Sequence, residues 1–410
     1  MKTLQSLFAL MLLLAYIPGS QAQSPYGDPC ATSNELQSRP GKYFTADQYP
    51  WPAVRSEYFK KLTTPAEKST AKQTLAKMEK LEQQSRSDLA PEGGSWESTY
   101  SSEGYQFLGD NRLADYRLQI GFHNFICVNN KIKRNGEYST ALRVFVNNIR
   151  LNTLSKYLDN ISYGGSMSDD KYGHKDWKTY KPGVASPKIK LFTFLECNNA
   201  NLINAINSGK GYWQDVPEKE IRKNTFDIVY RYWFIKKMDI PILLPVSRKE
   251  YLESLLELYD REQLYLPQSN NYEQNSATTR LSYFGDIPAV LANKKAIVNK
   301  LLKESSADWL SKQAVVNRQE DDYQNQKQKL PRYSSDFTFR KFYDDEKGAR
   351  PLYKYNPAYF ASTKQNKAEP ELLTIAFRYV PMPAHLKLVN NFTQQFDEGA
   401  WRALLTPAGK

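Results

Sequence analysis

Strict alternation of apolar and polar positions marks two strands in this chain. Residues 225–235 carry aromatic or aliphatic side chains at nearly every second position, and residues 373–379 repeat the pattern. Successive side chains of a strand point to opposite faces of a sheet, so each segment predicts a strand with one apolar face. Further strands are predicted at residues 189–196 and at residues 240–244, where flanking prolines favour an edge or a bend.

Asn135 and Gly136 predict a β-hairpin, because an Asn-Gly pair between strand-like runs favours a two-residue type I′ turn. Counting outward from this turn places Cys127 opposite Val144. Directly opposed residues share a face of the sheet. We therefore expect Cys127 and Val144 on one apolar face of the hairpin, with His123 at its far end.

Helices are predicted where a capping residue precedes an apolar stripe. Residues 64–67 read Thr-Pro-Ala-Glu, a capping box before a helix that runs to about Asp88, and residues 247–250 form a second box. Further helices begin near Pro288 and after Asp397. Because helices and strands do not alternate regularly, the sequence predicts an α+β fold with a mixed or antiparallel sheet.

The first 22 residues have the organisation of a signal peptide. Lys2 provides a basic start, residues 7–17 are apolar, and small residues lead to a cleavage site after Ala22. The apolar run is shorter than the roughly 20 residues that span a bilayer. No later apolar stretch is long enough to cross a membrane either. We therefore expect an exported protein that is soluble once the signal is removed.

Composition divides the chain into five segments. After the signal peptide at residues 1–22, residues 23–95 form an N-terminal arm and a surface helix, and residues 96–245 a sheet-rich core. Residues 246–330 are a helical segment. Residues 331–410 supply a strand and helices that should pack on the core.

The chain is basic and rich in aromatic residues. Its formal net charge is +12, and it has 28 Tyr, 19 Phe and 7 Trp, enough to bury a core. The basic residues are dispersed, which favours a role of the charge in solubility over a dedicated binding patch. No nucleic-acid-binding module is recognisable, so nucleic acid is not predicted, and the candidate partners are a carbohydrate or an acidic polymer. The pattern does not fix an oligomeric state.

Cysteine and histidine are scarce. Cys30, Cys127 and Cys197 permit one disulfide in an oxidising compartment, with the pairing open and one thiol left over. So few cysteines favour a bacterial envelope, either periplasmic or extracellular. Three histidines without metal-ligand spacing, and no phosphate-binding loop, give no reason to expect a metal or a cofactor.

The candidate site lies around Glu196. Residues 160–187 form a long stretch without apolar periodicity, and structureless loops longer than about 12–15 residues are often functional. The strand predicted at 189–196 would carry Glu196 at its end, partly withdrawn from water, and a second aromatic loop follows at 207–217. The candidate ligand-binding residues are Tyr163, His174, Trp177, Tyr180, Tyr212, Trp213 and Asp215.

Three functions compete for this pattern. The favoured one is a non-catalytic binding or structural protein of the cell envelope or extracellular space, because aromatic faces stack on sugars while Asp and Asn bind their polar edges. The second is a secreted hydrolase of a carbohydrate or cell-wall polymer, with Glu196 as acid or base and Asp215 or Asp227 as partner. The third is a charge-driven protein that binds acidic polymers until salt screens it. A purely structural alternative has Trp177 and Trp213 covering the core.

Overall fold

A computed structural model of the chain describes residues 30–86, 89–108, 111–138, 140–154, 190–217, 228–265, 276–330, 337–360 and 366–405. Helices and largely antiparallel sheets are mixed along these residues, which confirms the α+β class. The predicted signal peptide at residues 1–22, with its cleavage site at Ala22, lies outside the described residues. So does the segment 160–187.

The described residues form an eight-stranded main sheet in the order β1-β2-β3-β5-β13-β9-β8, with β4 pairing to β3. All its pairs are antiparallel except β1 with β2. The strands are β1 (Tyr43–Phe44), β2 (Gly94–Leu108), β3 (Asn111–Val128), β4 (Lys131–Arg134), β5 (Thr140–Val146), β8 (Tyr212–Pro217), β9 (Val229–Lys236) and β13 (Leu372–Tyr379).

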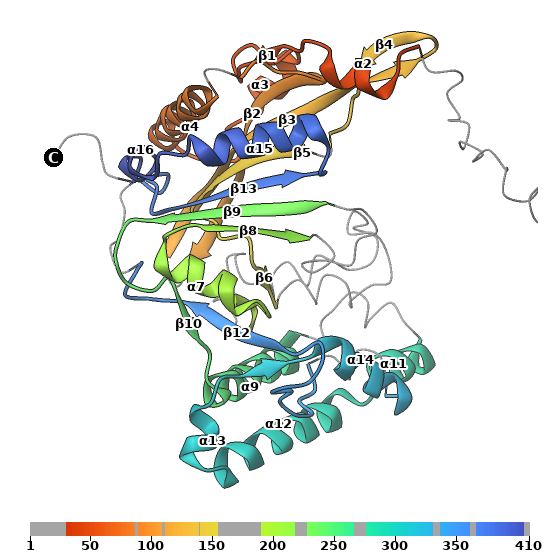
Figure 1. The fold of residues 1–410 in the computed structure, drawn as a ribbon. Helices are drawn as coiled ribbons and strands as arrows, with labels where there is room; N and C mark the ends of the chain where they lie inside the picture. Colours follow the sequence, from red (N-terminus) through yellow and green to blue (C-terminus); the bar gives the residue numbers. More distant parts are fainter. Residues whose placement is uncertain are drawn as a thin grey trace, which may run out of the picture.

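β13 lies in the middle of the main sheet although it comes late in the chain. It pairs with β5 on one side and with β9 on the other, as Figure 1 shows for the blue strand beside the green one. Leu373, Ile375 and Phe377 are buried among the helices on one face, whereas Leu372 is buried on the other. The sequence predicted a strand with one apolar face; the structure has one that is buried on both faces.

A smaller sheet lies on the other side of the main sheet from these helices (Figure 1). Its order among the described residues is β10-β12-β7-β6, with β11 pairing to β12. β10 is an edge strand, as the prolines around residues 240–244 predicted. The strands are β6 (Asn152–Thr153), β7 (Leu195–Glu196), β10 (Leu243–Pro245), β11 (Val315–Val316) and β12 (Arg350–Tyr355).

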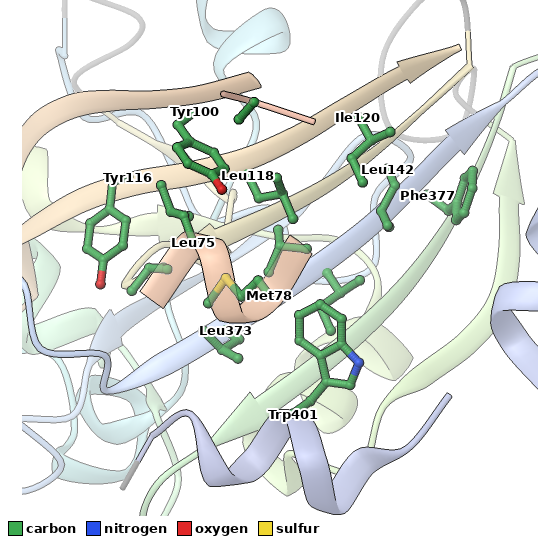
Figure 2. Packing of buried hydrophobic residues seen from close by; sticks show 14 of the residues in the cluster. Leu75, Met78, Tyr100, Tyr116, Leu118, Ile120, Leu142, Leu373, Phe377 and Trp401 are labelled. Carbon is green, nitrogen blue, oxygen red and sulfur yellow. The ribbon is translucent and has the colours of Figure 1, made fainter. Parts of the chain in front are cut away.

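One group of helices covers the outer face of the main sheet. Thr64 caps α4 with both halves of the predicted capping box, and Asp397 caps α16. Leu75 and Met78 of α4 point onto β3 and β13 and are fully buried, as is Trp401 of α16 (Figure 2). Burying each such side chain contributes about 1.5–3 kcal/mol. The helices of this group are α2 (Ser33–Ser38), α3 (Pro52–Ser56), α4 (Pro65–Ser85), α15 (Pro383–Gln394) and α16 (Glu398–Ala403).

A second group of helices packs around its own core beside the smaller sheet (Figure 1). The Ser247 hydroxyl accepts a hydrogen bond from the Glu250 amide at the start of α9, which is one half of the predicted capping box, while the Glu250 carboxylate pairs with Lys190 and Lys354. A third apolar cluster, which includes α7 and Phe234, fills the seam between the two sheets. The helices of the second group are α9 (Arg248–Tyr265), α11 (Ala277–Tyr283), α12 (Ile287–Glu304), α13 (Ala307–Ser311), α14 (Arg318–Lys327) and the 3-10 helix η2 (Lys190–Thr193), whereas α7 (Ala200–Ser208) belongs to the third cluster.

The predicted hairpin turn at Asn135 and Gly136 is wrong. β3 turns back at Asn129 and Asn130, whose φ angles of 53° and 55° suit a type I′ turn. Asn135 and Gly136 instead interrupt the returning strand, which continues as β5 along the same edge of β3. Asn tolerates the left-handed region better than most residues, so the Asn-Asn pair supports this turn without a glycine.

Because the turn was predicted in the wrong place, the side chains of β3 lie on the opposite face, relative to those of β5, from the one expected. Val144 pairs with Leu118, nine positions before the predicted partner Cys127. A shift by an odd number moves side chains to the opposite face. His123 therefore lies on the face away from Val144, where it meets Glu97.

The structure pairs Cys30 with Cys127 in a disulfide, with their Cα atoms 5.6 Å apart, and leaves Cys197 as a buried free thiol. The sequence had left this pairing open. The bond joins the segment before α2 to the end of β3, 97 positions further along the chain.

Candidate functional site

A cleft of about 550 Å³ opens at the seam between the two sheets. Its described lining comes from residues 149–152, residues 196–202, Tyr232, Phe234 and Arg350. These positions belong to the chain after β5, the turn from β7 into α7, and strands β9 and β12. A volume of this size is typical of sites for small ligands.

Glu196 stands in the wall of this cleft. It ends the two-residue strand β7, where it pairs with Asn152 on one side and Leu352 on the other. Only 5% of the residue is exposed, and its Oε1 lies 3.8 Å from Nη1 of Arg350. A buried carboxylate thus has a guanidinium beside it, at the edge of a cavity.

The strand predicted at residues 189–196 is wrong in extent. Residues 190–193 form η2, and only Leu195 and Glu196 are extended. Phe192 and Phe194 are buried in the core of the second helical group instead of forming a strand face with Glu196. The sequence pattern correctly predicts Glu196 at the end of a strand, but it does not predict which side chains surround it.

Asparagines form the floor where β7 leads into α7. The Asn199 side chain accepts a hydrogen bond from the Leu202 amide, 3.0 Å away, and so caps the helix. Asn198 and Asn201 are exposed beside it. The thiol of Cys197 donates to the Asn199 carbonyl at 3.5 Å, and burial raises its pKa, so it is a weak nucleophile.

A row of stacked aromatic rings on β9 contributes to the lining as well. Tyr230, Tyr232 and Phe234 alternate along β9, as the sequence predicted, and their rings stack on one face of the strand. The ring centroids are 5.6 Å and 6.0 Å apart, with interplanar angles of 7° and 10°. Tyr232 is half-buried and lines the cleft together with Phe234. These rings offer a flat apolar surface, and the tyrosines add phenolic hydroxyl groups at its edge.

The rim is built by a sharp bend after β5. Asn148 accepts a hydrogen bond from the Arg150 amide at 2.8 Å, and Arg150 has a φ of 60°. The Arg150 guanidinium lies 4.7 Å from the centroid of the Phe145 ring. This bend brings a second arginine to the cleft, because Arg350 enters from β12 on the opposite side.

The structure relocates part of the predicted site. Tyr212, Trp213 and Asp215 belong to strand β8, not to a loop, and Tyr212 pairs with Tyr232 of β9. Of these residues only the backbone is described. Tyr163, His174, Trp177, Tyr180 and the alternative partner Asp227 lie outside the described residues.

Several lining residues were missed from the sequence. Arg350 and Arg150 reach the cleft only through the pairing of distant strands, and nothing in their local sequence marks them. Tyr232 carried a signal, since its alternation with Tyr230 and Phe234 was visible. That pattern predicts a strand and does not by itself mark a binding surface.

Two histidines have structural surroundings. His123 is buried, with Nε2 3.7 Å from Oε2 of Glu97 and Nδ1 3.0 Å from the Asn135 carbonyl, and burial lowers its pKa. Glu97 is also paired with Arg134. The His385 ring lies 2.9 Å from the Thr140 hydroxyl, and burial lowers its pKa as well.

Within the described part of the chain, no three His, Cys, Asp or Glu side chains are grouped so as to hold a metal ion. Among the same residues, no helix combines the length and apolar character needed to cross a bilayer. Comparisons with family models, with curated proteins and with solved structures found no match to this chain. The site must therefore be interpreted from its own residues.

Proposed function

We propose that this is an exported, non-catalytic binding protein of the cell envelope or extracellular space. Its ligand is a carbohydrate held in the seam cleft. The observation that carries this proposal is a cleft of about 550 Å³ whose described lining combines aromatic rings with asparagine amides. Sugars present apolar faces and polar edges, and these two kinds of side chain match both.

The aromatic and the amide side chains have distinct tasks in this proposal. Tyr232, whose ring stacks on the buried ring of Phe234, packs on the apolar face of a sugar ring. Asn198 and Asn201 offer amide donors and acceptors to its hydroxyl groups. The paired Glu196 and Arg350 supply a fixed acceptor and donor that orient the ring.

Binding without catalysis is favoured by the composition of the lining. Glycosidases of the common type need two carboxyl groups on either side of the scissile bond. Among the described lining residues Glu196 is the one carboxylate, and an arginine already engages it. The described lining therefore supplies groups for recognition and one carboxylate of the pair that such a glycosidase needs.

Ligand titration of the Tyr232→Ala variant tests this proposal. We expect a panel of neutral and acidic oligosaccharides to contain a ligand whose affinity falls about tenfold in Tyr232→Ala, because one stacking surface is lost. The matched control is Tyr323→Ala on α14, an exposed tyrosine outside the lining. Equal affinity in both variants would contradict the proposal.

A hydrolase is the second candidate, and the burial of Glu196 beside a cavity is the observation that favours it. Asp215 would be its partner. Glu196→Gln separates the two functions, because a hydrolase loses turnover of a polysaccharide while it still binds the polymer. A binding protein shows no turnover in either form.

Charge-driven binding of an acidic polymer is distinguished by salt. Exposed charges are screened at physiological ionic strength, whereas stacking is not. Affinity that survives added salt and depends on Tyr232 supports the cleft. Affinity that disappears with salt and ignores Tyr232 supports the charge-driven alternative.

A further inference from the structure

A second cavity, of about 500 Å³, lies within the second helical group, apart from the seam cleft. Its described lining consists of Arg248 at the start of α9, three residues of α12, Trp309 of α13, residues 339–342 and Asp344. Figure 1 shows α9, α12 and α13 together at the bottom of the molecule. None of these residues contributes to the seam cleft.

Arg248 is buried in this lining, with 3% of the residue exposed. Its guanidinium lies 4.7 Å from the centroid of the Trp309 ring and 5.0 Å from that of Phe342. Cation–π contacts of this kind place aromatic rings against the flat faces of the cation. Its N–H groups point outward along the edge of the guanidinium plane.

Only some of the N–H donors of the Arg248 guanidinium have an acceptor among the described residues. Nη2 donates to both carboxylate oxygens of Asp344, at 2.6 Å and 2.5 Å. Nε is buried and has no acceptor among the described residues. Buried donors are nearly always paired in folded proteins, so the described residues leave the guanidinium of Arg248, beside the cavity, incompletely paired.

The remaining charges of the lining have the same sign. Lys300, Arg340 and Lys341 join Arg248, and Asp344 is the one carboxylate that the described lining contains. Outside the lining, Lys300 faces Glu304 at 3.9 Å and Lys341 faces Glu346 at 2.6 Å. Both pairs are exposed, and such pairs are weakened by water and salt.

We propose that this cavity binds an oxyanion, the carboxylate or phosphoryl group of a small ligand. Arg248 donates to the anion, while Lys300 and Arg340 neutralise its charge from either side. Trp309 and Phe342 provide apolar surface for the body of the ligand. Charge-assisted hydrogen bonds to an arginine are short and strong, which makes a buried guanidinium a selective anchor for such groups.

Titration with two probes, glucuronate and inorganic phosphate, tests the proposal by calorimetry. We expect at least one probe to bind with a dissociation constant below about 10 mM. Binding of glucuronate alone identifies an acidic sugar, and binding of phosphate alone identifies a phosphorylated ligand. If neither probe binds, the proposal is overturned.

Variants locate the site. Replacing Arg248 removes a buried ion pair and endangers the fold, so Lys300→Gln and Arg340→Gln carry the test. We expect each to weaken binding by about tenfold. The matched control is Lys303→Gln, which changes an exposed lysine on the same helix outside the lining. Equal binding in all three variants would overturn the proposal. Tyr232→Ala should leave the binding of phosphate, and the effect of Lys300→Gln on it, unchanged, which keeps this result separate from the seam cleft.

Discussion

Lys294 of α12 and Glu262 of α9 form an ion pair inside the second helical group, with Nζ 3.6 Å from Oε2 and 2% of each side chain exposed. Lys294 also lies 5.4 Å from the centroid of the Tyr259 ring. Removing two charges from water is costly, and their attraction repays this cost only while both are present. The pair therefore fixes how α9 and α12 pack against each other.

Removing one partner of this pair should destabilise the fold far more than replacing both partners by apolar residues. We expect Lys294→Met to lower the free energy of unfolding by about 3–5 kcal/mol, because Glu262 then remains buried and uncompensated. The double variant with Glu262→Leu should recover most of the loss. Urea denaturation measures both, and Lys295→Met, which breaks the more exposed pair with Asp260, should cost at most about 1 kcal/mol. A double variant as unstable as the single one would refute the argument.

The disulfide should make stability depend on redox conditions. Because Cys30 and Cys127 are 97 positions apart, their bond restricts the unfolded chain strongly. We expect reduction to lower the free energy of unfolding by about 2–4 kcal/mol. The measurement is chemical denaturation with and without reductant. Cys127→Ser should match the reduced protein and ignore the reductant, and a wild-type midpoint that reductant leaves in place would contradict the expectation.

Glu82 of α4 should make the free energy of unfolding depend on pH. Burial raises its pKa from 4.5 to about 7, against the opposing effect of Arg86, whose Nε lies 2.9 Å from Oε1. Between about pH 4.5 and pH 7 the folded state then holds a proton that the unfolded state has lost. The free energy of unfolding contributed by Glu82 therefore falls as pH rises through this window.

The Glu82→Gln variant measures how much of this pH dependence comes from Glu82. Its unfolding free energy should change less than that of the wild type between about pH 5 and pH 8. Burial also raises the pKa of Asp115 to about 6, which adds a slope of the same sign to both proteins, so the difference between them is the quantity to compare. Glu57→Gln changes an exposed carboxylate and serves as control. Parallel pH profiles for wild type and Glu82→Gln would disprove the prediction.

Asn147, directly after β5, ties β3 to the segment that leads into β13. Its amide nitrogen donates to the carbonyls of Ala114 and Glu369, at 3.2 Å and 3.1 Å, and its oxygen accepts from the Glu371 amide at 2.8 Å. Its φ of 58° also favours Asn over Ala. We expect Asn147→Ala to cost about 3 kcal/mol or more by denaturation. Asn299→Ala, on the exposed side of α12, should stay within about 0.5 kcal/mol, and comparable losses in the two variants would contradict this role.

Local signals in the sequence were sufficient for helix starts. Thr64, Ser247 and Asp397 cap helices where predicted, because a cap depends on residues three positions away. The alternation along β9 was equally local. Such features require no knowledge of the rest of the fold.

The sequence alone could not give the pairing register of β3 with β5, because it offers two possible positions for the turn between them. Asn135 with Gly136 is the stronger hairpin signal, but the chain turns at Asn129 and Asn130. The earlier turn places Leu118 and Ile120 opposite Val144 and Leu142, and all four are buried in one core, so burial favours this turn. The cleft depended on the same long-range pairing, since Arg350 meets Glu196 only after β12 has paired with β7.

β13 enters the main sheet from the far end of the chain. Leu373 pairs with Val146, a residue 227 positions earlier, and its other neighbour is Ile235 of β9. A ribosome therefore releases β5 and β9 long before the strand that joins them exists. Until then the nascent chain carries two half-sheets with open edges, which are the usual starting points of aggregation. A chain cut anywhere before Leu372 would have a split sheet, not a shorter one.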